Sequence, residues 1–323
     1  MSPLAAVGQP LAFDAGLKLG QPLVLGVLQG SVYGLIGLGL VLLFKSNRIF
    51  NFAQAEFGTL AGICAYLGLN GKLLHIPWHM PYPVACAVGV LIGTLSAVAT
   101  ERLVVRPLFH RPKVILVVGT VGVLLLLIAL ESLVFPQGQS LPAFNDPRQG
   151  ALSGLKDPAI RLHFASYNVQ WEQVLTLLVL VILALASVAF FRYSRTGTAI
   201  LAVSQEPVAA QTVGISVGRI SLITWTIAGF LGSIAGILVL AGSPVLSPGI
   251  VTGTALVGGI TAAVLGGVTS LPGAFVGGIL IGLLQAYAGT FLTQFPGSES
   301  VAVGVVLLLV LLVRPRGLLG QEA

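Results

Sequence analysis

Nine long apolar runs divide this chain of 323 residues, and they constrain its fold more than any other feature. An α-helix needs about 20 apolar residues to cross the hydrocarbon core of a bilayer. Only 8% of the residues are charged, whereas a soluble domain carries roughly 25%. The pattern predicts an all-α, polytopic transmembrane helical bundle with helices over 22–44, 52–69, 82–101, 114–135, 173–191, 220–242, 251–267, 271–292 and 299–313.

The distribution of basic residues predicts how the bundle is oriented. If the runs alternate sides, eleven Lys and Arg residues fall in one group of loops and five in the other. Basic residues collect on the cytoplasmic side, so we expect the N-terminus outside and the C-terminus in the cytoplasm. The expected parts are an external segment (1–21), a membrane domain (22–320) with an external loop (136–170) and a cytoplasmic loop (192–219), and a short tail (321–323). Some runs are expected to be re-entrant or split, so nine counts runs and not full spans.

Several classes of function are excluded by what the sequence lacks. It has no Walker-type glycine loop, catalytic triad or metal-ligand pattern, so we expect no enzyme activity, metal or cofactor of its own. The net charge of +6 is explained by the cytoplasmic loops rather than by nucleic-acid binding. Cys64 and Cys86 both lie in apolar runs, and no disulfide is expected.

The first candidate site is the polar start of the second run, IFNFAQAEFGTLAG at 49–62. Asn51, Phe52, Gln54 and Glu56 would form a broken helix that lines or gates a translocation path, a known device of transporters. An acidic residue at membrane depth is costly unless it is paired or faces water. The alternative is that Asn51 caps a helix and Glu56 favours the positive end of its dipole.

The second candidate site is TAAVLGGVTSLPGAFVGG at 261–278, where Gly266, Gly267 and Pro272 interrupt two apolar runs. Unwound backbone at membrane depth is tolerated only where protein or a water-filled cavity surrounds it. One interrupted element in each half of the chain also suggests an internal repeat.

The third candidate site is the polar, helix-prone insert GTAILAVSQEPVAAQTVGI at 197–215. Its length exceeds what a simple turn needs, so we expect it to dock on a cytoplasmic partner. The residues assigned to docking are Glu206, Pro207, Ala209, Ala210, Gly214 and Ile215, with Gly214 as a helix C-terminal cap. The alternative is an amphipathic helix lying on lipid, although 198–215 offers no basic side chain for headgroups.

Three weaker signals concern packing and the external side. Glycines at four-residue spacing, such as Gly26, Gly30 and Gly34, predict close helix contacts. Alternation at Ile160, Leu162 and Phe164 is a weak strand signal. Glu131 lies near the outer end of an apolar run, where an interfacial position is favoured over a proton relay.

Four motifs in order resemble the LivH-type permease subunit of ATP-binding-cassette importers for branched-chain (hydrophobic) amino acids. They are FNFAQAE at 50–56, SQEPVAAQTVGI at 204–215, AVLGGVTSLPGAFVGG at 263–278 and VRPRGLLG at 313–320, with support from 106–108 and 120–122. Gln54 and Ala55 stand where the family pattern has His and Gly. The resemblance covers roughly 22–320.

The resemblance implies an importer in the bacterial cytoplasmic (inner) membrane, with ATP and Mg on partner subunits. Those partners would be two cytoplasmic ATPases, a second related permease chain or a second copy, and an external substrate-binding protein, with membrane lipid around them. The insert at 197–215 would be the coupling helix. Relatives also carry urea and short amides, which remain alternative substrates, and an autonomous ion-coupled carrier remains a further alternative.

Overall fold

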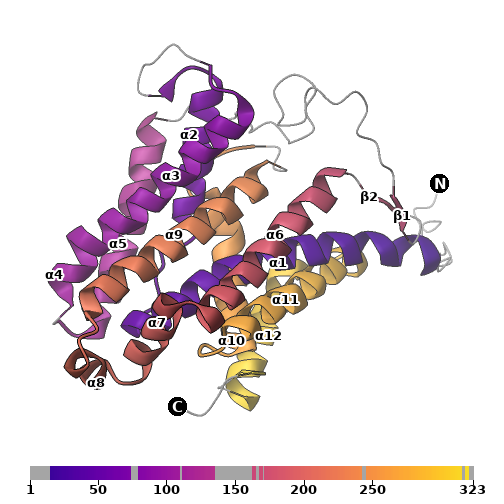
Figure 1. The fold of residues 1–323 in the computed structure, drawn as a ribbon. Helices are drawn as coiled ribbons and strands as arrows, with labels where there is room; N and C mark the ends of the chain where they lie inside the picture. Colours follow the sequence, from indigo (N-terminus) through magenta and orange to yellow (C-terminus); the bar gives the residue numbers. More distant parts are fainter. Residues whose placement is uncertain are drawn as a thin grey trace, which may run out of the picture.

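The computed structural model describes residues 15–73, 79–109, 111–134, 162–164, 167–169, 171–241, 245–314 and 317–319. In these residues the fold is a helical bundle, as predicted (Figure 1). Its helices are α1 (Ala15–Asn47), α2 (Glu56–Leu69), α3 (Tyr82–Thr100), α4 (Arg106–Leu108), α5 (Lys113–Val134), α6 (Trp171–Tyr193), α7 (Arg195–Gln205), α8 (Pro207–Thr212), α9 (Val217–Leu240), α10 (Val257–Gly266), α11 (Leu271–Phe291) and α12 (Ser298–Val313). Two π-helical turns, η2 (Glu101–Val105) and η3 (Thr252–Leu256), precede α4 and α10.

Each of the nine apolar runs corresponds to a helix among the described residues. Six of these helices are long and apolar enough to cross a membrane, whereas α2, η3 with α10, and α12 are shorter. The main difference from the predicted bounds is α1, which begins at Ala15 rather than near residue 22. Hydropathy marks the apolar stretch, but a helix continues through polar residues beyond it.

Glycine faces bring the helices of the bundle together, as the spacing predicts. A Cβ added to Gly30 of α1 would lie 2.6 Å from the backbone oxygen of Gly278 on α11. A Cβ added to Gly58 of α2 would lie 2.7 Å from the backbone oxygen of Gly232 on α9. Small residues at both contacts therefore let the backbones approach closely.

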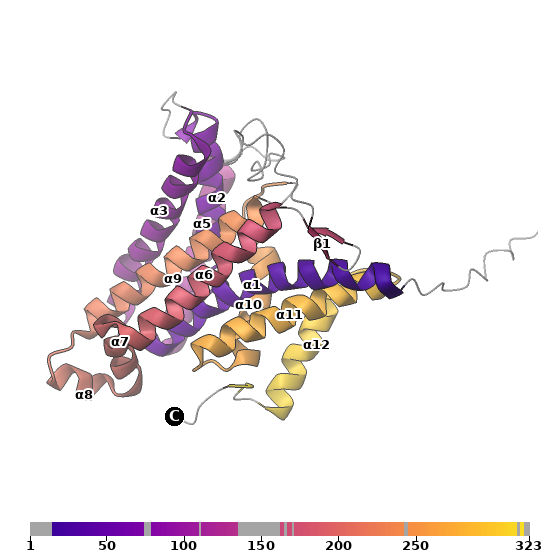
Figure 2. The ribbon, with the colours of Figure 1, turned by 45° about the vertical axis from the view of Figure 1, so that its right-hand side comes forward.

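The helix contacts have an internal symmetry that supports a repeat. Helix α1 packs against α10 and α11, and α9 packs against α2 and α3 (Figure 2). The two units are α1–α3 and α9–α11, and the first helix of each packs against the second and third helices of the other. The second helix is short in both units, namely α2 in one and α10 with η3 in the other. This packing pairs the turn before α2 with the stretch before η3, not with the interruption at 261–278. The sequences of the two units are too dissimilar to show which segments are equivalent. The helix contacts alone show this equivalence.

A small hairpin lies on the segment between α5 and α6. Strand β1 (Leu162–Phe164) pairs antiparallel with β2 (Tyr167–Val169), with Leu162 opposite Val169 and Phe164 opposite Tyr167. The strand signal at Leu162 and Phe164 is confirmed, while Ile160 and most of the loop at 136–170 lie outside the described residues.

Candidate functional site: a cavity, two turns and a projecting insert

The polar turn before α2 is buried inside the bundle. Asn51 and Gln54 have no exposed surface. The Asn51 side-chain oxygen accepts from the backbone N–H of Ala53 at 3.0 Å, and its amide donates to Gln54 at 3.4 Å. The Gln54 amide donates in turn to the backbone oxygen of Ala228 on α9 at 2.8 Å. Asn51 therefore stabilises the turn, whereas the residue at the N-cap of α2 is Ala55, without a side-chain cap bond.

Phe52 ties this turn to a second family motif. Its backbone N–H donates to the hydroxyl of Thr120 on α5 at 3.3 Å. Thr120 belongs to the short motif at 120–122 and is fully buried. Two motifs 68 residues apart in the sequence thus contact each other directly.

Glu56, the first residue of α2, is fully buried and holds the backbone before α10. Its carboxylate accepts from the N–H of Gly249 at 3.1 Å and from the hydroxyl of Thr252 at 2.5 Å. The neighbouring N–H of Val251 donates to the Thr59 hydroxyl of α2 at 3.3 Å. The acidic residue is therefore satisfied by hydrogen-bond donors, as a carboxylate at the start of a helix in an apolar bundle must be.

Glu131 lies beside Glu56 and is buried in the protein. It is 2% exposed, and its carboxylate accepts from the same Gly249 N–H at 3.4 Å. Within the described part of the chain, the single ion pair is between Arg106 and Glu101, so no described basic residue pairs with either acid. The Glu131 side chain faces α2 and the loop before η3, while its interfacial depth near the end of α5 stays a prediction.

The interruption at 266–273 is a tight turn between α10 and α11, in which Gly266, Gly267 and Gly273 are buried and Pro272 is exposed. Gly267 follows α10 with φ 101°, a conformation that favours glycine. Pro272 stands in the first turn of α11, where its missing N–H costs no helix bond. The N–H groups of Leu318 and Leu319 donate to the backbone oxygens of Leu265 and Gly266 at 2.7 and 3.1 Å. The C-terminal motif therefore closes the end of α10.

The predicted docking insert forms two short helices, α7 and α8, joined at Glu206 (Figure 1). Ala210 is 4% exposed and faces the protein, while Val208 and Val213 are 72% and 75% exposed. Glu206, Ala209 and Gly214 are also exposed. The sequence assigned Ala209 and Ala210 to one contact, but in the isolated chain only Ala209 is exposed, since Ala210 packs against the protein. The exposed valines were missed, although their apolar character in a polar insert was a usable signal.

Gly214 ends α8 as predicted. It has φ 86°, and its N–H donates to the Gln211 oxygen at 3.0 Å while the Ile215 N–H donates to the Ala210 oxygen at 3.0 Å. This pair of bonds is a Schellman motif, which glycine favours because it lacks a Cβ.

The insert is fixed to the bundle by α7. Ile200 and Val203 are buried, and the Arg48 guanidinium donates to the Ser204 oxygen at 2.8 Å. Beside the insert, Arg195 and Arg219 flank a groove of about 260 Å³. The insert is therefore a projection anchored to the bundle through α7, with an apolar tip and two cations nearby.

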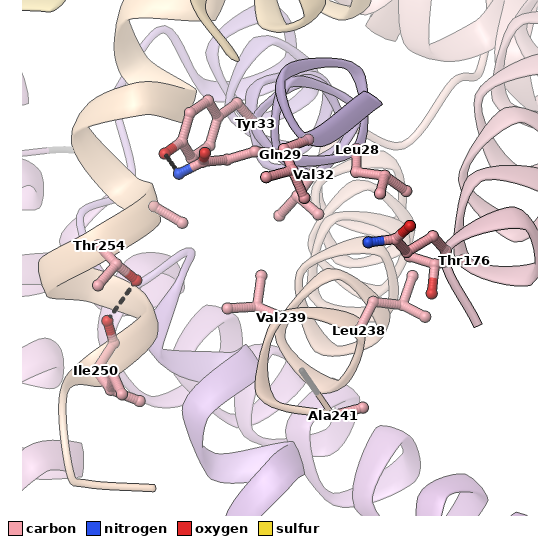
Figure 3. Close-up of a pocket in the computed structure, with 13 residues that line it drawn as sticks. Leu28, Gln29, Val32, Tyr33, Thr176, Leu238, Val239, Ala241, Ile250 and Thr254 are labelled. Atoms are coloured by element: carbon pink, nitrogen blue, oxygen red, sulfur yellow. Dashed lines mark hydrogen bonds between the residues drawn. The ribbon is translucent and has the colours of Figure 1, made fainter. Parts of the chain in front are cut away.

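A cavity of about 510 Å³ lies between α1, α6, α9 and η3 (Figure 3). Its wall is mostly apolar, with Leu28, Val32 and Val239 among the lining side chains. Gln29 and Thr254 supply polar groups, and no described residue that lines it is charged. Such a pocket, with a few polar groups in an apolar wall, is typical of a small-molecule site.

The seven residues predicted for the path or gate do not line this cavity within the described part of the chain. They are Asn51, Phe52, Gln54, Glu56, Gly266, Gly267 and Pro272. Their assignment to a path or gate stays a prediction. The cavity-lining residues were missed, although Gln29 and Tyr33, four residues apart in an apolar run, form one polar stripe on a helix face.

A bundle of long apolar helices around a largely apolar cavity, with two short helices projecting from one end, defines a polytopic helical membrane protein. Comparison with known proteins then places it: the family described as "Branched-chain amino acid transport system / permease component" matches residues 23–313, and the chain belongs to this family. It is therefore a multi-pass membrane protein and a transport subunit, not an enzyme.

Three relatives illustrate the similarity. The chain is 28% identical to the high-affinity branched-chain amino acid transport system permease protein BraD of Pseudomonas aeruginosa, over 93% of this chain and 95% of BraD. It is 28% identical to LivH of Escherichia coli K12, over 92% of this chain and 94% of LivH. It is 24% identical to a probable LivH of Methanocaldococcus jannaschii, over 94% of both chains.

Proposed function

We propose that this chain is the membrane-spanning permease subunit of an ATP-binding-cassette importer for branched-chain and other hydrophobic amino acids. The names of its relatives support this substrate class, since BraD and LivH are permease proteins of branched-chain amino acid transport systems. The largely apolar cavity favours an aliphatic solute over urea or a short amide, which offer little apolar surface to such a wall.

The projecting insert is the observation that carries the coupling mechanism. In our proposal α8 seats in a cleft of a cytoplasmic ATPase, with Val208 and Val213 buried against it and Ala209 allowing close approach. Both valines are largely exposed in the isolated chain, and burying them would contribute favourable free energy on docking. Arg195 and Arg219 would meet acidic residues of the partner.

The orientation of the chain and the other subunits of the importer follow from this assignment. The N-terminus would be outside and the C-terminus in the cytoplasm of the cytoplasmic (inner) membrane. Two ATPases would carry ATP and Mg, a second related permease chain or a second copy would complete the membrane part, and an external binding protein would deliver the solute. Nucleic acid has no role.

The polar turn at Asn51–Glu56 and the turn at Gly266–Pro272 act in this proposal as gate elements. Hydrogen bonds of the first turn hold the start of α2, and hydrogen bonds at the second turn close the end of α10. A change in their position would move α2 and α10, which pack against α9 and α1, two of the helices that line the cavity.

Uptake of leucine into vesicles that contain the complete importer tests the coupling step. Ala209→Trp places an indole on the contact face of α8. Because a misfit at a docking face lowers the binding affinity about tenfold or more, ATP-driven uptake is expected to fall about tenfold or more. Replacing Glu206 with Lys is expected to weaken uptake in the same direction. The matched control is Leu125→Trp, a position on α5 that is 61% exposed and lies outside the insert.

Co-purification of the ATPases with the permease gives the second readout. The proposal predicts loss of ATPase from the Ala209→Trp complex and normal recovery with Leu125→Trp. Normal uptake and normal ATPase recovery with Ala209→Trp would refute docking at α8.

A further inference from the structure

The cavity between α1, α6, α9 and η3 carries an inference about where the solute enters the protein. We propose that it is the receiving site for a zwitterionic amino acid with an aliphatic side chain. This inference rests on the proposed transport function and adds the site and its chemistry. Its volume of about 510 Å³ exceeds that of a single ordered water by far and lies in the range of small-molecule sites.

The position of the cavity suits delivery from outside. Its residues on α9, Leu238 and Val239, lie at the end of that helix, and its residues on α6, Gln173 and Thr176, lie near the start. The α7–α8 insert joins the opposite ends of the same two helices. The cavity and the insert therefore lie at opposite ends of α6 and α9, and a cytoplasmic insert places the cavity toward the outside.

Polar groups on α1 and η3 bind the ammonium and carboxylate groups of the amino acid in this proposal. The Gln29 amide donates to the Tyr33 hydroxyl at 2.6 Å, and this hydroxyl donates to the Gln285 amide oxygen at 2.6 Å. A glutamine amide has two donor hydrogens and an acceptor oxygen, so Gln29 keeps capacity for a further partner. Thr254 lines the same space from η3, where its hydroxyl donates to the Ile250 backbone oxygen at 2.7 Å and keeps its lone pairs as acceptors (Figure 3).

The charge of the wall selects the class of solute. An ionised side chain would be costly in a cavity whose described wall is uncharged, because nothing would compensate its charge. A zwitterion has no net charge, and amide and hydroxyl groups can serve both its ammonium and its carboxylate. Leu28, Val32 and Val239 offer apolar surface to an aliphatic side chain.

The buried Glu56 fixes the backbone that forms the η3 wall of the cavity. Glu56 binds Gly249 and Thr252, which flank the lining residue Ile250 and precede Thr254. η3 itself is a π-helical turn, an irregularity that is frequent at functional sites. Glu56 is thus a positioning residue for the wall and does not contact the solute.

Narrowing the cavity tests the site in the complete importer. Thr254→Trp fills the space from η3 and is expected to lower ATP-driven leucine uptake about tenfold or more, while ATP hydrolysis and recovery of the ATPases stay within about twofold of the unmodified importer. The matched control is Val257→Trp, one turn further along and exposed on the surface but not lining the cavity. Normal leucine uptake by Thr254→Trp would overturn the proposal.

Thiol labelling tests occupancy directly and distinguishes the two proposals. Thr254→Cys in a Cys64→Ala, Cys86→Ala importer is reacted with a membrane-impermeant thiol reagent from outside, without ATP. Millimolar leucine is expected to slow labelling about threefold or more, with no protection of Val257→Cys and none by lysine at the same concentration. Absence of protection by leucine, or equal protection by lysine, would overturn the site or its chemical class.

These outcomes separate from failure of the transport function. An unmodified importer that shows no ATP-driven leucine uptake would refute the proposed function. Normal leucine uptake by both the unmodified importer and the Thr254→Trp variant would refute the receiving site and leave the proposed function intact.

Discussion

The carboxylates of Glu56 and Glu131, from α2 and α5, accept hydrogen bonds from one donor, the backbone N–H of Gly249, at 3.1 and 3.4 Å. Both acids are buried, and no described basic residue forms an ion pair with them. Their roles differ, because Glu56 also binds Thr252 whereas one oxygen of Glu131 has no hydrogen-bond partner.

Glu56 is expected to matter more for stability than Glu131. Glu56→Ala leaves the Gly249 N–H and the Thr252 hydroxyl without their acceptor and is expected to cost about 1–3 kcal/mol. Glu131→Gln keeps the shape of the side chain and removes one of two adjacent acids, so the melting temperature is expected to stay or rise. Thermal unfolding of the purified protein in detergent measures both. A larger loss for Glu131→Gln than for Glu56→Ala would contradict this ranking.

The α1–α11 contact is expected to depend on Gly30. Its Cβ would lie 2.6 Å from the Gly278 oxygen and from the Ile279 Cα, so Gly30→Val forces the two helices apart and is expected to cost about 1–3 kcal/mol or more. The control is Gly122→Val on α5, where an added Cβ meets no atom within 4 Å. Gel filtration of the detergent-solubilised protein is expected to show aggregation of the first variant only. Similar profiles for both variants would argue against close packing at Gly30.

Gly214 is expected to be required for coupling because it ends α8. Gly214→Val places a β-branched residue at φ 86° and is expected to cost about 1–2 kcal/mol locally, which disorders the tip of the insert. Gly214→Asn is the matched control, since Asn tolerates this conformation. ATP-driven leucine uptake should fall for Val and persist for Asn. Equal uptake by the two variants would show that the backbone shape at this position does not matter for coupling.

Arg48 combines a left-handed backbone with the hydrogen bond that holds α7. Its φ is 57°, and it donates to the Ser204 oxygen at 2.8 Å. Arg48→Ala and Arg48→Gly both lose this bond, and both are expected to lower ATP-driven uptake. Because only Gly relieves the backbone strain, Arg48→Gly is expected to be about 1 kcal/mol more stable than Arg48→Ala in thermal unfolding. The opposite order would show that this conformation is not strained.

Features that depend on neighbouring residues along the chain were predictable. The apolar runs mark the helices, including α10 and α11 on either side of the Gly266–Gly267 interruption. Gly214 was assigned as a helix cap, and Gly30 as a packing residue. Each of these follows from local preferences of the backbone, or from which residues share one face of a helix.

Contacts between distant residues were decided by the tertiary structure alone. Glu56 meets Gly249, 193 residues later, and Glu131 meets the same N–H only because α5 packs beside α2. The cavity likewise exists only where α1, α6, α9 and η3 come together. Helix periodicity shows which face of a helix is apolar or small, but not which other helix covers that face. The sequence by itself determined a membrane bundle with a projecting insert, and packing determined where its acids and its cavity lie.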